Sequence, residues 1–215
     1  MGRLYTRGGD RGYTQLPGGD GVPAQRVRKD SPELSALGGL DELNALLGLA
    51  LAEAQRINHM RIGDSLRNVQ EELLRVGAVL AAVESGAPPT LELEAQTIRK
   101  MEREIDEVCA DLPALKHFIL PGGFELAARL HVARAVCRRT ERAAVATLGP
   151  PPATPETPAD EAGAATPPHR PSHPPEPKAA GEMILTYLNR LSDLLFALAR
   201  LANRDAGMND KVWIP

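Results

Sequence analysis

Hydrophobic residues recur along most of the chain with the spacing expected of helices. Apolar positions separated by alternating steps of three and four residues lie on one face of a helix, and five segments repeat this pattern. Their positions are Leu37, Leu40, Leu43, Leu47 and Leu51; Ile62, Leu66, Val69, Leu73, Val76, Leu80 and Val83; Ile98, Met101, Ile105 and Val108; Leu130, Ala133, Cys137, Thr140 and Ala144; and Ile184, Leu188, Leu191, Leu195 and Leu198. No alternating strand-like run of useful length interrupts them. The pattern predicts an all-α chain, a five-helix bundle behind a Gly-rich N-terminal arm of about 30 residues.

Two of the predicted helices carry recognisable start signals. Ser31 precedes Pro32, and a serine followed by proline is a favourable opening for a helix, here one over about 32–55. Thr90 is the predicted cap of the third helix, with Glu92 and Glu94 in its first turn.

Composition agrees with one soluble domain spanning 1–215. The chain has 215 residues, 43% of them hydrophobic and only 3% aromatic, so Leu, Ala, Val and Ile must build the core. A net charge of −3 offers no basic field, and we expect no nucleic acid or membrane partner. The sequence contains no run of about 18 apolar residues, so we expect no membrane-spanning segment. The polar start of the chain predicts a cytoplasmic protein without a leader.

The two cysteines indicate neither a disulfide framework nor a zinc site. Cys109 and Cys137 lie far apart in the sequence and form no C-x-x-C motif. We expect both to be free, buried thiols in a reducing compartment.

Proline is concentrated in one segment. Of the 19 prolines, 11 fall between Pro150 and Pro177, in a stretch without apolar periodicity. Such composition predicts a disordered or polyproline-like insertion over 149–180, extruded between two helices. It is interpreted as a linker, with a proline-recognition role as the alternative.

The arm contains the parts of a phosphate cradle. Residues 5–14 read YTRGGDRGYT, in which three glycines permit positive φ and close backbone approach, and two arginines and two threonines add charge and hydroxyl donors. It is not a Walker A loop, because no Gly-Lys-Ser/Thr follows. The alternative is a flexible polar N-terminus.

A polar stripe borders the apolar face of the fourth predicted helix. His131, Arg134, Arg138 and Glu141 fall at i, i+3, i+7 and i+10. Such charges beside a core are costly unless they pair or face a ligand. The stripe favours an anion site or an interface, and a solvated, salt-bridged face is the alternative.

Polar or glycine residues break the pattern at three further places. Asp41 interrupts the Leu-rich first helix, where it could form a buried or interfacial ion pair. Asn189, Ser192 and Asp193 form a polar face on the fifth helix. Phe118 opens the apolar run FILPGG at 118–123, whose glycines suit a close approach at a helix start.

Five motifs in order make the chain similar to the PduO-type ATP:cob(I)alamin adenosyltransferases. They are YTRGGDRGYT at 5–14, GGLDELN at 38–44, FILPGG at 118–123, RAVCRRTER at 134–142 and LNRLSD at 188–193. Together they span the chain apart from the proline-rich insertion. The chain departs from the family pattern at Gly8, where Thr or Asn is usual, at Thr140, where Ala is usual, and in the insertion itself.

The resemblance implies a homotrimer of five-helix bundles with active sites between subunits. It implies transfer of the 5′-deoxyadenosyl group of ATP to the cobalt of cob(I)alamin, with adenosylcobalamin and triphosphate as products and Mg²⁺ accompanying ATP. Because the cobalt is itself the nucleophile, the protein would supply orientation and charge neutralisation. A reductase and an adenosylcobalamin-dependent mutase are the implied partners.

The resemblance also assigns roles residue by residue. Arg134 should pair with Asp41 across the subunit boundary, and Phe118 should press on the lower face of the corrin and keep its benzimidazole base off the cobalt. The residues implied to bind ATP are Thr6, Arg7, Gly8, Gly9, Asp10, Gly12, Thr14, Gln15, Lys29, Arg138, Arg139, Thr140, Glu141, Arg142 and Asn189. No protein-only metal site is expected.

Two other classes of function remain as rivals. A corrinoid carrier would hand finished cofactor to another enzyme, and turnover without an acceptor enzyme would distinguish it. A plain helical scaffold would not need a Gly-rich arm beside an arginine stripe. A ferritin-like di-metal bundle is excluded because its Glu-x-x-His pairs do not occur in the predicted helices.

Overall fold

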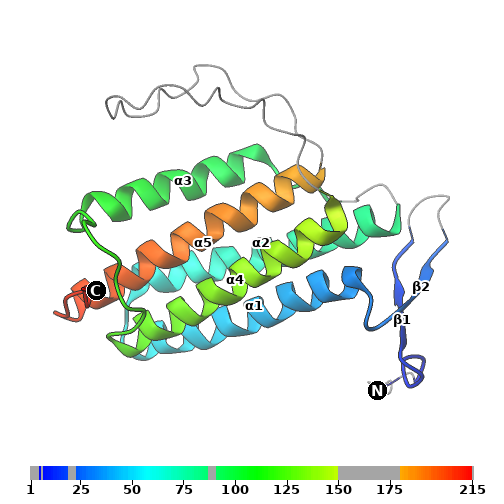
Figure 1. Ribbon diagram of the computed structural model, residues 1–215, viewed down its shortest axis with the longest axis horizontal. Coiled ribbons are helices and arrows are strands. Elements are labelled where there is room, and N and C mark those ends of the chain that lie inside the picture. The colour runs from blue at the N-terminus through cyan, green and yellow to red at the C-terminus, as the bar shows by residue number, and fades with distance from the viewer. Residues whose placement is uncertain (1–4, 6, 19–22, 87–90, 150–179, 215) are drawn as a thin grey trace.

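The computed structural model describes residues 5, 7–18, 23–86, 91–149 and 180–214 (Figure 1). Within these ranges the chain forms a short hairpin followed by five long helices, which confirms the predicted bundle. The elements are β1 (Tyr13–Leu16), β2 (Gln25–Arg28), α1 (Pro32–Arg56), α2 (Met60–Ser85), α3 (Ala95–Ala110), α4 (Glu125–Leu148) and α5 (Ala180–Asp205).

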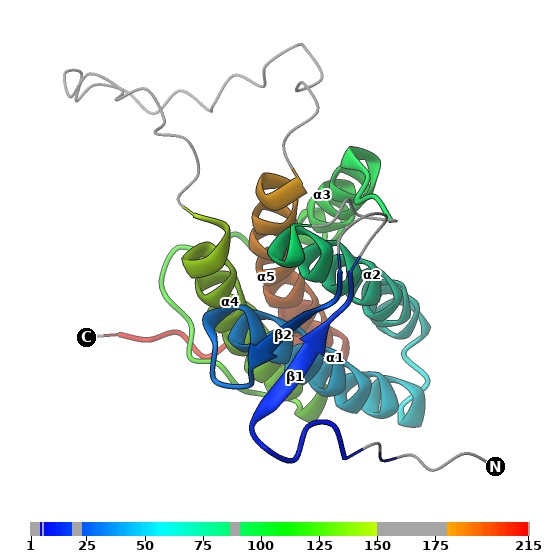
Figure 2. The same ribbon diagram turned by 90° about the vertical axis from the view of Figure 1, so that its right-hand side faces the viewer.

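Helix α5 occupies the centre of the bundle. It packs against α4, α3 and α2, while α1 packs against α4 and α2 (Figure 2). The predicted apolar stripes meet in one core: every repeating position of α4 and α5 is buried. In α1, α2 and α3 the repeating positions are also buried, except for Leu37, Leu51, Val83 and Ile105, which are half-buried against the core. Spacing alone therefore identified the faces that pack together.

The two predicted helix starts had different outcomes. The Ser31 hydroxyl oxygen accepts a hydrogen bond from the Leu34 amide at 3.5 Å, with Pro32 in the first turn, as expected of an N-cap. The prediction for α3 was wrong, because the helix begins at Ala95 and both glutamates precede it. Leu93 is buried in the core, which holds the chain extended as far as Glu94. Thr90 lies outside the described residues.

The hairpin was not predicted. Strands β1 and β2 pair antiparallel, with Tyr13 opposite Arg28 and Leu16 opposite Gln25. Each has only four residues and little apolar alternation, so the period-two signal is too short to detect. Leu16 is buried and anchors the hairpin, which extends beyond one end of the bundle (Figure 1).

The buried face of α1 explains an apolar composition that would otherwise suggest a membrane helix. Judged by length and composition alone, helix α1 is long and apolar enough to cross a bilayer. However, Leu40, Leu43 and Leu47 are buried in the bundle core. The helix therefore has an apolar face that other helices of the same chain cover.

Both cysteines are free thiols, but only one of them is buried. Cys137 is buried and its Sγ–H donates to the Leu188 carbonyl at 3.3 Å, whereas Cys109 is exposed, which corrects the expectation that both are buried. Position 109 lies on the solvent side of α3, one residue beyond the buried Val108.

Within the predicted insertion, residues 150–179 lie outside the described ranges, and its flanks are helices as expected.

Candidate active site

A cavity of about 810 Å³ lies between the loop before α4 and the middle of α4, and it reaches the middle of α5. The loop before α4 forms one wall, α4 and α5 form the floor, and the segment after α5 closes a side. The lining residues are Leu115, Lys116, His117, Phe118, Ile119, Arg134, Arg138, Ser192, Asp193, Phe196 and Trp213. The cavity thus combines aromatic surface with several basic side chains.

Phe118 presents its ring to this cavity from a loop that is held by its backbone. The side chain is 82% exposed, which is unusual for a phenylalanine. Trp213 N–H donates to the Phe118 carbonyl at 2.8 Å, and the Leu120 N–H donates to the Lys211 carbonyl at the same distance. Ile119 and Val212 form an antiparallel bridge between these two bonds. The backbone is therefore paired while the ring remains available to a ligand.

Arg134 and Arg138 line the same cavity from successive turns of α4. The Arg134 guanidinium lies 5.8 Å from the centre of the Phe196 ring, within the range of a cation–π contact. Burial lowers the pKa of Arg134, and the positive charge of Arg138 lowers it further. The Arg134 Nε is buried, and none of the described residues accepts a hydrogen bond from it. The half-buried charge is therefore uncompensated within the described chain.

His131 lies one turn before Arg134 but is buried. Its ring is 6.0 Å from that of Phe196, in an edge-on arrangement. Burial lowers the pKa of His131, which favours the neutral ring. The predicted polar stripe on α4 is thus divided: its first member belongs to the core, and its later members face the cavity or solvent.

Glu141 and Asn189, which the resemblance assigned to ATP binding, are hydrogen-bonded to each other. The Asn189 amide donates to the Glu141 carboxylate at 3.1 Å, joining α5 to α4. Arg190 donates to the Asn189 side-chain oxygen at 2.8 Å and pairs with Glu102 of α3 at 2.9 Å. The network fixes the Asn189 side chain in a half-buried position next to the α4 arginines.

The remaining α4 candidates point in different directions. Arg139 is exposed and forms an ion pair with Glu42 of α1. Arg142 is exposed and donates to the Arg138 carbonyl at 3.2 Å. Thr140, by contrast, is 1% exposed, and its hydroxyl donates to the Val136 carbonyl at 3.0 Å. The resemblance placed Thr140 among the ATP-binding residues, but within this chain its side chain packs in the core.

The N-terminal arm folds into two overlapping turns that contain two residues with positive φ. The Asp10 amide donates to the Arg7 carbonyl at 3.4 Å and the Gly12 amide donates to the Gly9 carbonyl at 3.3 Å, giving two consecutive turns. Arg7 and Gly12 have positive φ, at 61° and 76°. Consecutive turns of this kind expose backbone N–H groups on one side, where anions bind.

Lys29 lies beside the same turn. A Cβ added to Gly9 would lie 3.0 Å from the Lys29 ammonium nitrogen, so a side chain there would crowd the end of the lysine. The Lys29 amide donates to the Gly12 carbonyl at 2.9 Å, which ties the end of β2 to the turn. Thr14 and Gln15 follow in β1, paired with Val27 and Arg26. Thr6 lies outside the described residues.

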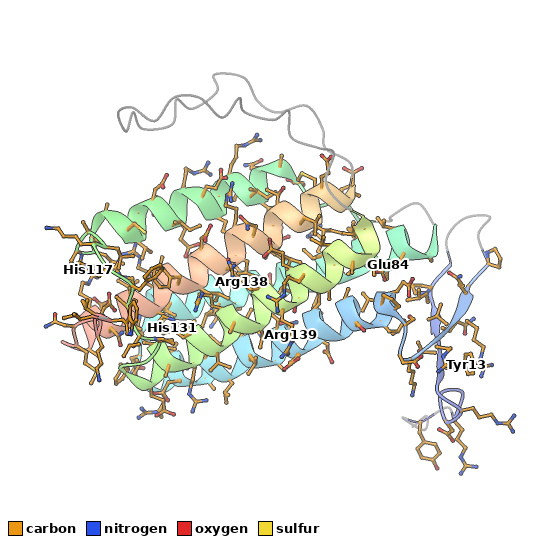
Figure 3. All side chains as sticks on the ribbon, viewed as in Figure 1. Tyr13, Glu84, His117, His131, Arg138 and Arg139 are labelled. Carbon is orange, nitrogen blue, oxygen red and sulfur yellow. The ribbon has the colours of Figure 1, made fainter. Side chains whose placement is uncertain are left out.

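The parts of the predicted site are separated along a single chain. Figure 3 shows Tyr13 in the hairpin beyond one end of the bundle, His117 at the opposite end, and Arg138 and Arg139 between them. Asp41 is exposed on α1 and forms no ion pair with any described residue. One chain therefore brings together Phe118, Arg134 and Arg138, and separately the arm residues, but does not join the two groups.

The model of one protein family matches most of this chain. It is described as cobalamin adenosyltransferase and matches residues 4–202. The chain belongs to the cobalamin adenosyltransferase family. This confirms the resemblance inferred from the sequence motifs.

Members of the family resemble the chain over nearly its whole length. A corrinoid adenosyltransferase from Mycobacterium tuberculosis is 40% identical over 217 residues, covering 99% of this chain and 93% of its own. One from Bacillus subtilis is 35% identical over 209 residues, covering 97% and 90%. A solved structure of a phenylalanine-to-alanine variant of a PduO-type ATP:corrinoid adenosyltransferase from Lactobacillus reuteri, complexed with cobalamin and ATP, has a TM-score of 0.73 with 28% identity, covering 99% of this chain and 100% of that one.

The sequence motifs missed two aromatic residues of this adenosyltransferase cavity. Phe196 belongs to α5, and its ring contacts His131 and Arg134 of α4. Trp213 lies in the segment after α5. Phe196 lies between residues of the apolar stripe, so nothing in its spacing indicated a cavity. Trp213 is the only tryptophan of the chain, at an exposed position, and that was the available signal.

Proposed function

We propose that the chain transfers the 5′-deoxyadenosyl group of ATP to the cobalt of cob(I)alamin, giving adenosylcobalamin and inorganic triphosphate. One observation carries the proposal: the cavity places the exposed Phe118 ring together with the cationic Arg134 and Arg138. An apolar ring suits a flat macrocycle, and guanidinium groups suit phosphate oxygens. The Lactobacillus reuteri relative that was solved with cobalamin and ATP supports this choice of substrates.

The reaction needs little covalent chemistry from the chain. An electron pair of the cobalt in cob(I)alamin forms the new bond to C5′ of ATP, and the C5′–oxygen bond breaks with its electron pair leaving on triphosphate. The chain must align the two substrates and neutralise the departing charge. No nucleophilic Ser, Cys or His is required. This is consistent with a cavity wall that is aromatic and basic.

In this proposal the arm and the middle of α4 bind ATP together. The turn around Gly9, with Lys29 above it, receives the triphosphate, and Arg138 supplies a second cation. Glu141 and Asn189 hold the nucleoside end, and their mutual hydrogen bond pre-orients them. Mg²⁺ enters on the phosphate oxygens of ATP, which are the hard ligands it prefers.

We further propose that the active form is a homotrimer with sites between subunits. Two observations support this. The arm and the cavity lie at separate places on one chain, and the half-buried Arg134 lacks an ion partner among the described residues while Asp41 is exposed. A half-buried charge without a partner is costly, and Asp41 of an adjoining copy would compensate it.

Phe118 is assigned a steric role. It carries no acid, base or nucleophile, and its exposed ring can exclude water and the benzimidazole base from the lower face of the cobalt. Keeping that position empty makes reduction of cob(II)alamin to cob(I)alamin easier. A cytoplasmic setting, a reductase that supplies this electron and a mutase that accepts the product complete the proposal.

Anaerobic incubation with Mg-ATP and chemically reduced cobalamin tests the activity. We expect the cob(I)alamin absorbance to decay with formation of adenosylcobalamin and one triphosphate per turnover. Release of product without an acceptor enzyme would distinguish an enzyme from a carrier. Decay that does not depend on ATP, or binding without alkylation, would contradict the proposed reaction.

A further inference from the structure

Three polar residues near the end of α5, two of them buried and one half-buried, form a group that contacts the loop lining the cavity without lining the cavity itself. Arg200 and Asn203 belong to the last turns of α5, with 6% and 3% of their surfaces exposed, and Asp210 follows in the segment after the helix. We call Arg200, Asn203 and Asp210 the C-terminal polar cluster. Buried charges and amides are stable only when they are hydrogen-bonded, so their partners show what the cluster holds in place.

Arg200 joins the segment after α5 to the beginning of the loop. Its Nε donates to the Asp210 carboxylate at 2.6 Å, and its Nη2 donates to the Pro113 carbonyl at 2.7 Å. A guanidinium can serve both acceptors at once because its donors are arranged in a rigid plane. The pair with Asp210 is almost fully removed from water, with side-chain exposures of 7% and 17%.

Asn203 joins the same segment to the end of the loop. Its side-chain amide donates to the Gly122 carbonyl at 3.1 Å and to the Asp210 carboxylate at 3.2 Å, and its oxygen accepts from the Phe124 amide at 2.9 Å. A Cβ at Gly123 would lie 2.2 Å from this oxygen, and Gly123 has a φ of 101°, so glycine is required there on two grounds.

The cluster therefore holds both ends of the loop that carries Phe118. Between Pro113 and Gly122 the loop has no helix, and its other backbone partner is the segment after α5, through Lys211 and Trp213. That segment is itself held to α5 by Asp210 and by the Met208 amide, which donates to the Asn203 carbonyl at 2.8 Å. The loop and the segment thus form one unit, fixed from behind at Arg200 and Asn203.

We propose that Arg200, Asn203 and Asp210 are positioning residues for Phe118, and that they act by fixing the loop and the segment after α5 as one wall of the cavity. The inference rests on the proposed function only in assigning the corrin to that cavity. None of the three lines the cavity. Their contribution to reduction of cob(II)alamin is made through the Phe118 backbone.

This role differs from a contribution to stability alone. Exclusion of an axial ligand depends on where the ring is held, and a displacement of about 1 Å at a reacting centre can cost about a hundredfold in rate. Alkylation of cob(I)alamin does not use the ring. Loosening the cluster should therefore slow the reaction that starts from cob(II)alamin much more than the reaction that starts from cob(I)alamin.

Trp213 allows the attachment to be measured independently of activity. It is the only tryptophan of the chain and lies in the attached segment. In Asp210→Asn and Asn203→Asp, which keep side-chain size, we expect greater acrylamide quenching and lower anisotropy of Trp213 fluorescence, with the helical circular dichroism retained. Asp205→Asn is the matched control, because Asp205 lies at the same end of α5 but pairs with His59 and Arg204. Unchanged Trp213 fluorescence in both cluster variants would overturn the proposal.

The second measurement compares the two rates in the same variants. We expect the rate from cob(II)alamin with a reductant to fall by about tenfold to a hundredfold. The rate from prereduced cob(I)alamin should fall by less than about threefold. The spectrum of four-coordinate cob(II)alamin, in which no axial ligand is bound to the cobalt, should weaken. Arg200→Lys keeps the charge but loses the planar array of donors that reaches both acceptors in the wild type, and it should give an intermediate effect. Equal loss of both rates would assign the cluster to folding alone and overturn the positioning role. If the wild-type chain has no activity, the proposed function fails, while the fluorescence still tests the attachment.

Discussion

The Thr140 hydroxyl oxygen lies 2.7 Å from the position that a Cβ on Gly39 would occupy. The two residues face each other where α1 and α4 cross, and Thr140 is buried there. Glycine lets the two helices approach closely enough for the threonine to fill the space. Gly39, the second glycine of the GGLDELN motif, is thus explained by helix packing.

Gly39→Ala should destabilise the fold. The added methyl would overlap the Thr140 side chain, and overpacking of this kind costs about 1–3 kcal/mol. Gly38→Ala is the matched control, because no atom lies within 4 Å of its added Cβ and alanine favours a helix by about 0.5–1 kcal/mol. Urea unfolding of both variants should give changes of opposite sign. Equal stabilisation would show that α1 and α4 can move apart without cost.

Arg138→Ala should nearly abolish use of ATP while leaving the bundle folded. Arg138 is exposed, lines the cavity and makes no ion pair with any described residue, so its removal disturbs little within the chain. Loss of one charge-assisted contact to phosphate costs about 1.5–3 kcal/mol. ATP binding by calorimetry and turnover should both fall. Arg103→Ala on the exposed side of α3 is the control, and similar losses in the two variants would remove Arg138 from the site.

Exchanging the charges of Asp41 and Arg134 tests the contact between subunits. Each single change, Asp41→Arg or Arg134→Asp, should weaken corrinoid use and assembly, because removing one partner of a desolvated pair costs about 3–5 kcal/mol. The double variant should recover part of both losses. Sedimentation velocity gives the assembly state and a double-mutant cycle gives the coupling energy. Strictly additive effects would mean that the two residues do not meet in the assembly.

Phe118→Ala should leave ATP affinity nearly intact and selectively impair reaction from cob(II)alamin. The ring is 82% exposed, so its loss creates no core cavity and should change the melting temperature little. Prereduced cob(I)alamin should restore part of the rate. The ratio of the two rates in variant and wild type is the measurement. If both rates fall by the same factor and the four-coordinate spectrum survives, the ring only packs the loop.

Glu84 should make the stability of the fold depend on pH. Burial, and to a smaller extent the nearby Glu33 carboxylate, raises the pKa of this half-buried carboxyl from 4.5 to about 7. The nearby Thr147 hydroxyl donates to the Ala144 carbonyl at 3.1 Å and not to Glu84. The Glu84 oxygens therefore lack a hydrogen-bonding partner among the described residues. Between these two pKa values the folded chain binds more protons than the unfolded chain, so stability falls as the pH rises from about 4.5 to about 7.

Glu84→Gln should remove this dependence. One pKa unit corresponds to about 1.4 kcal/mol, and screening by water at a half-buried site reduces the effect, so we expect the variant to gain about 1–2 kcal/mol relative to wild type between pH 5 and pH 8. Urea unfolding at both pH values measures it. Glu71→Gln, an exposed position on the same helix, shows whether removing any carboxylate of α2 has this effect. Equal stability curves for wild type and Glu84→Gln would refute the assignment.

The sequence predicted the bundle because its signal is repeated. Each helix carries four or more apolar positions at regular spacing, so errors at single positions do not alter the result. The hairpin escaped detection because four residues per strand carry too little pattern. The start of α3 was misplaced because burial of Leu93, a tertiary effect, outweighed the local capping preference.

For the site, motifs predicted which residues carry chemistry more reliably than how each one is oriented. Phe118, Arg134 and Arg138 do line one cavity. Thr140 lies in the middle of a charged motif and yet faces the core, because side chains on successive residues of a helix point about 100° apart. The C-terminal polar cluster could not be found from spacing, since its members act through backbone carbonyls of a distant loop.

The central position of α5 has a consequence for synthesis on the ribosome. The helix that contributes most to the core is made after the other four, so the faces of α2, α3 and α4 that pack against it stay uncovered until residue 205 has emerged. Exposed apolar faces on nascent chains are prone to association. A chain interrupted before α5 would therefore lack the element against which α2, α3 and α4 pack, and quality control should recognise it as unfolded instead of as a smaller bundle.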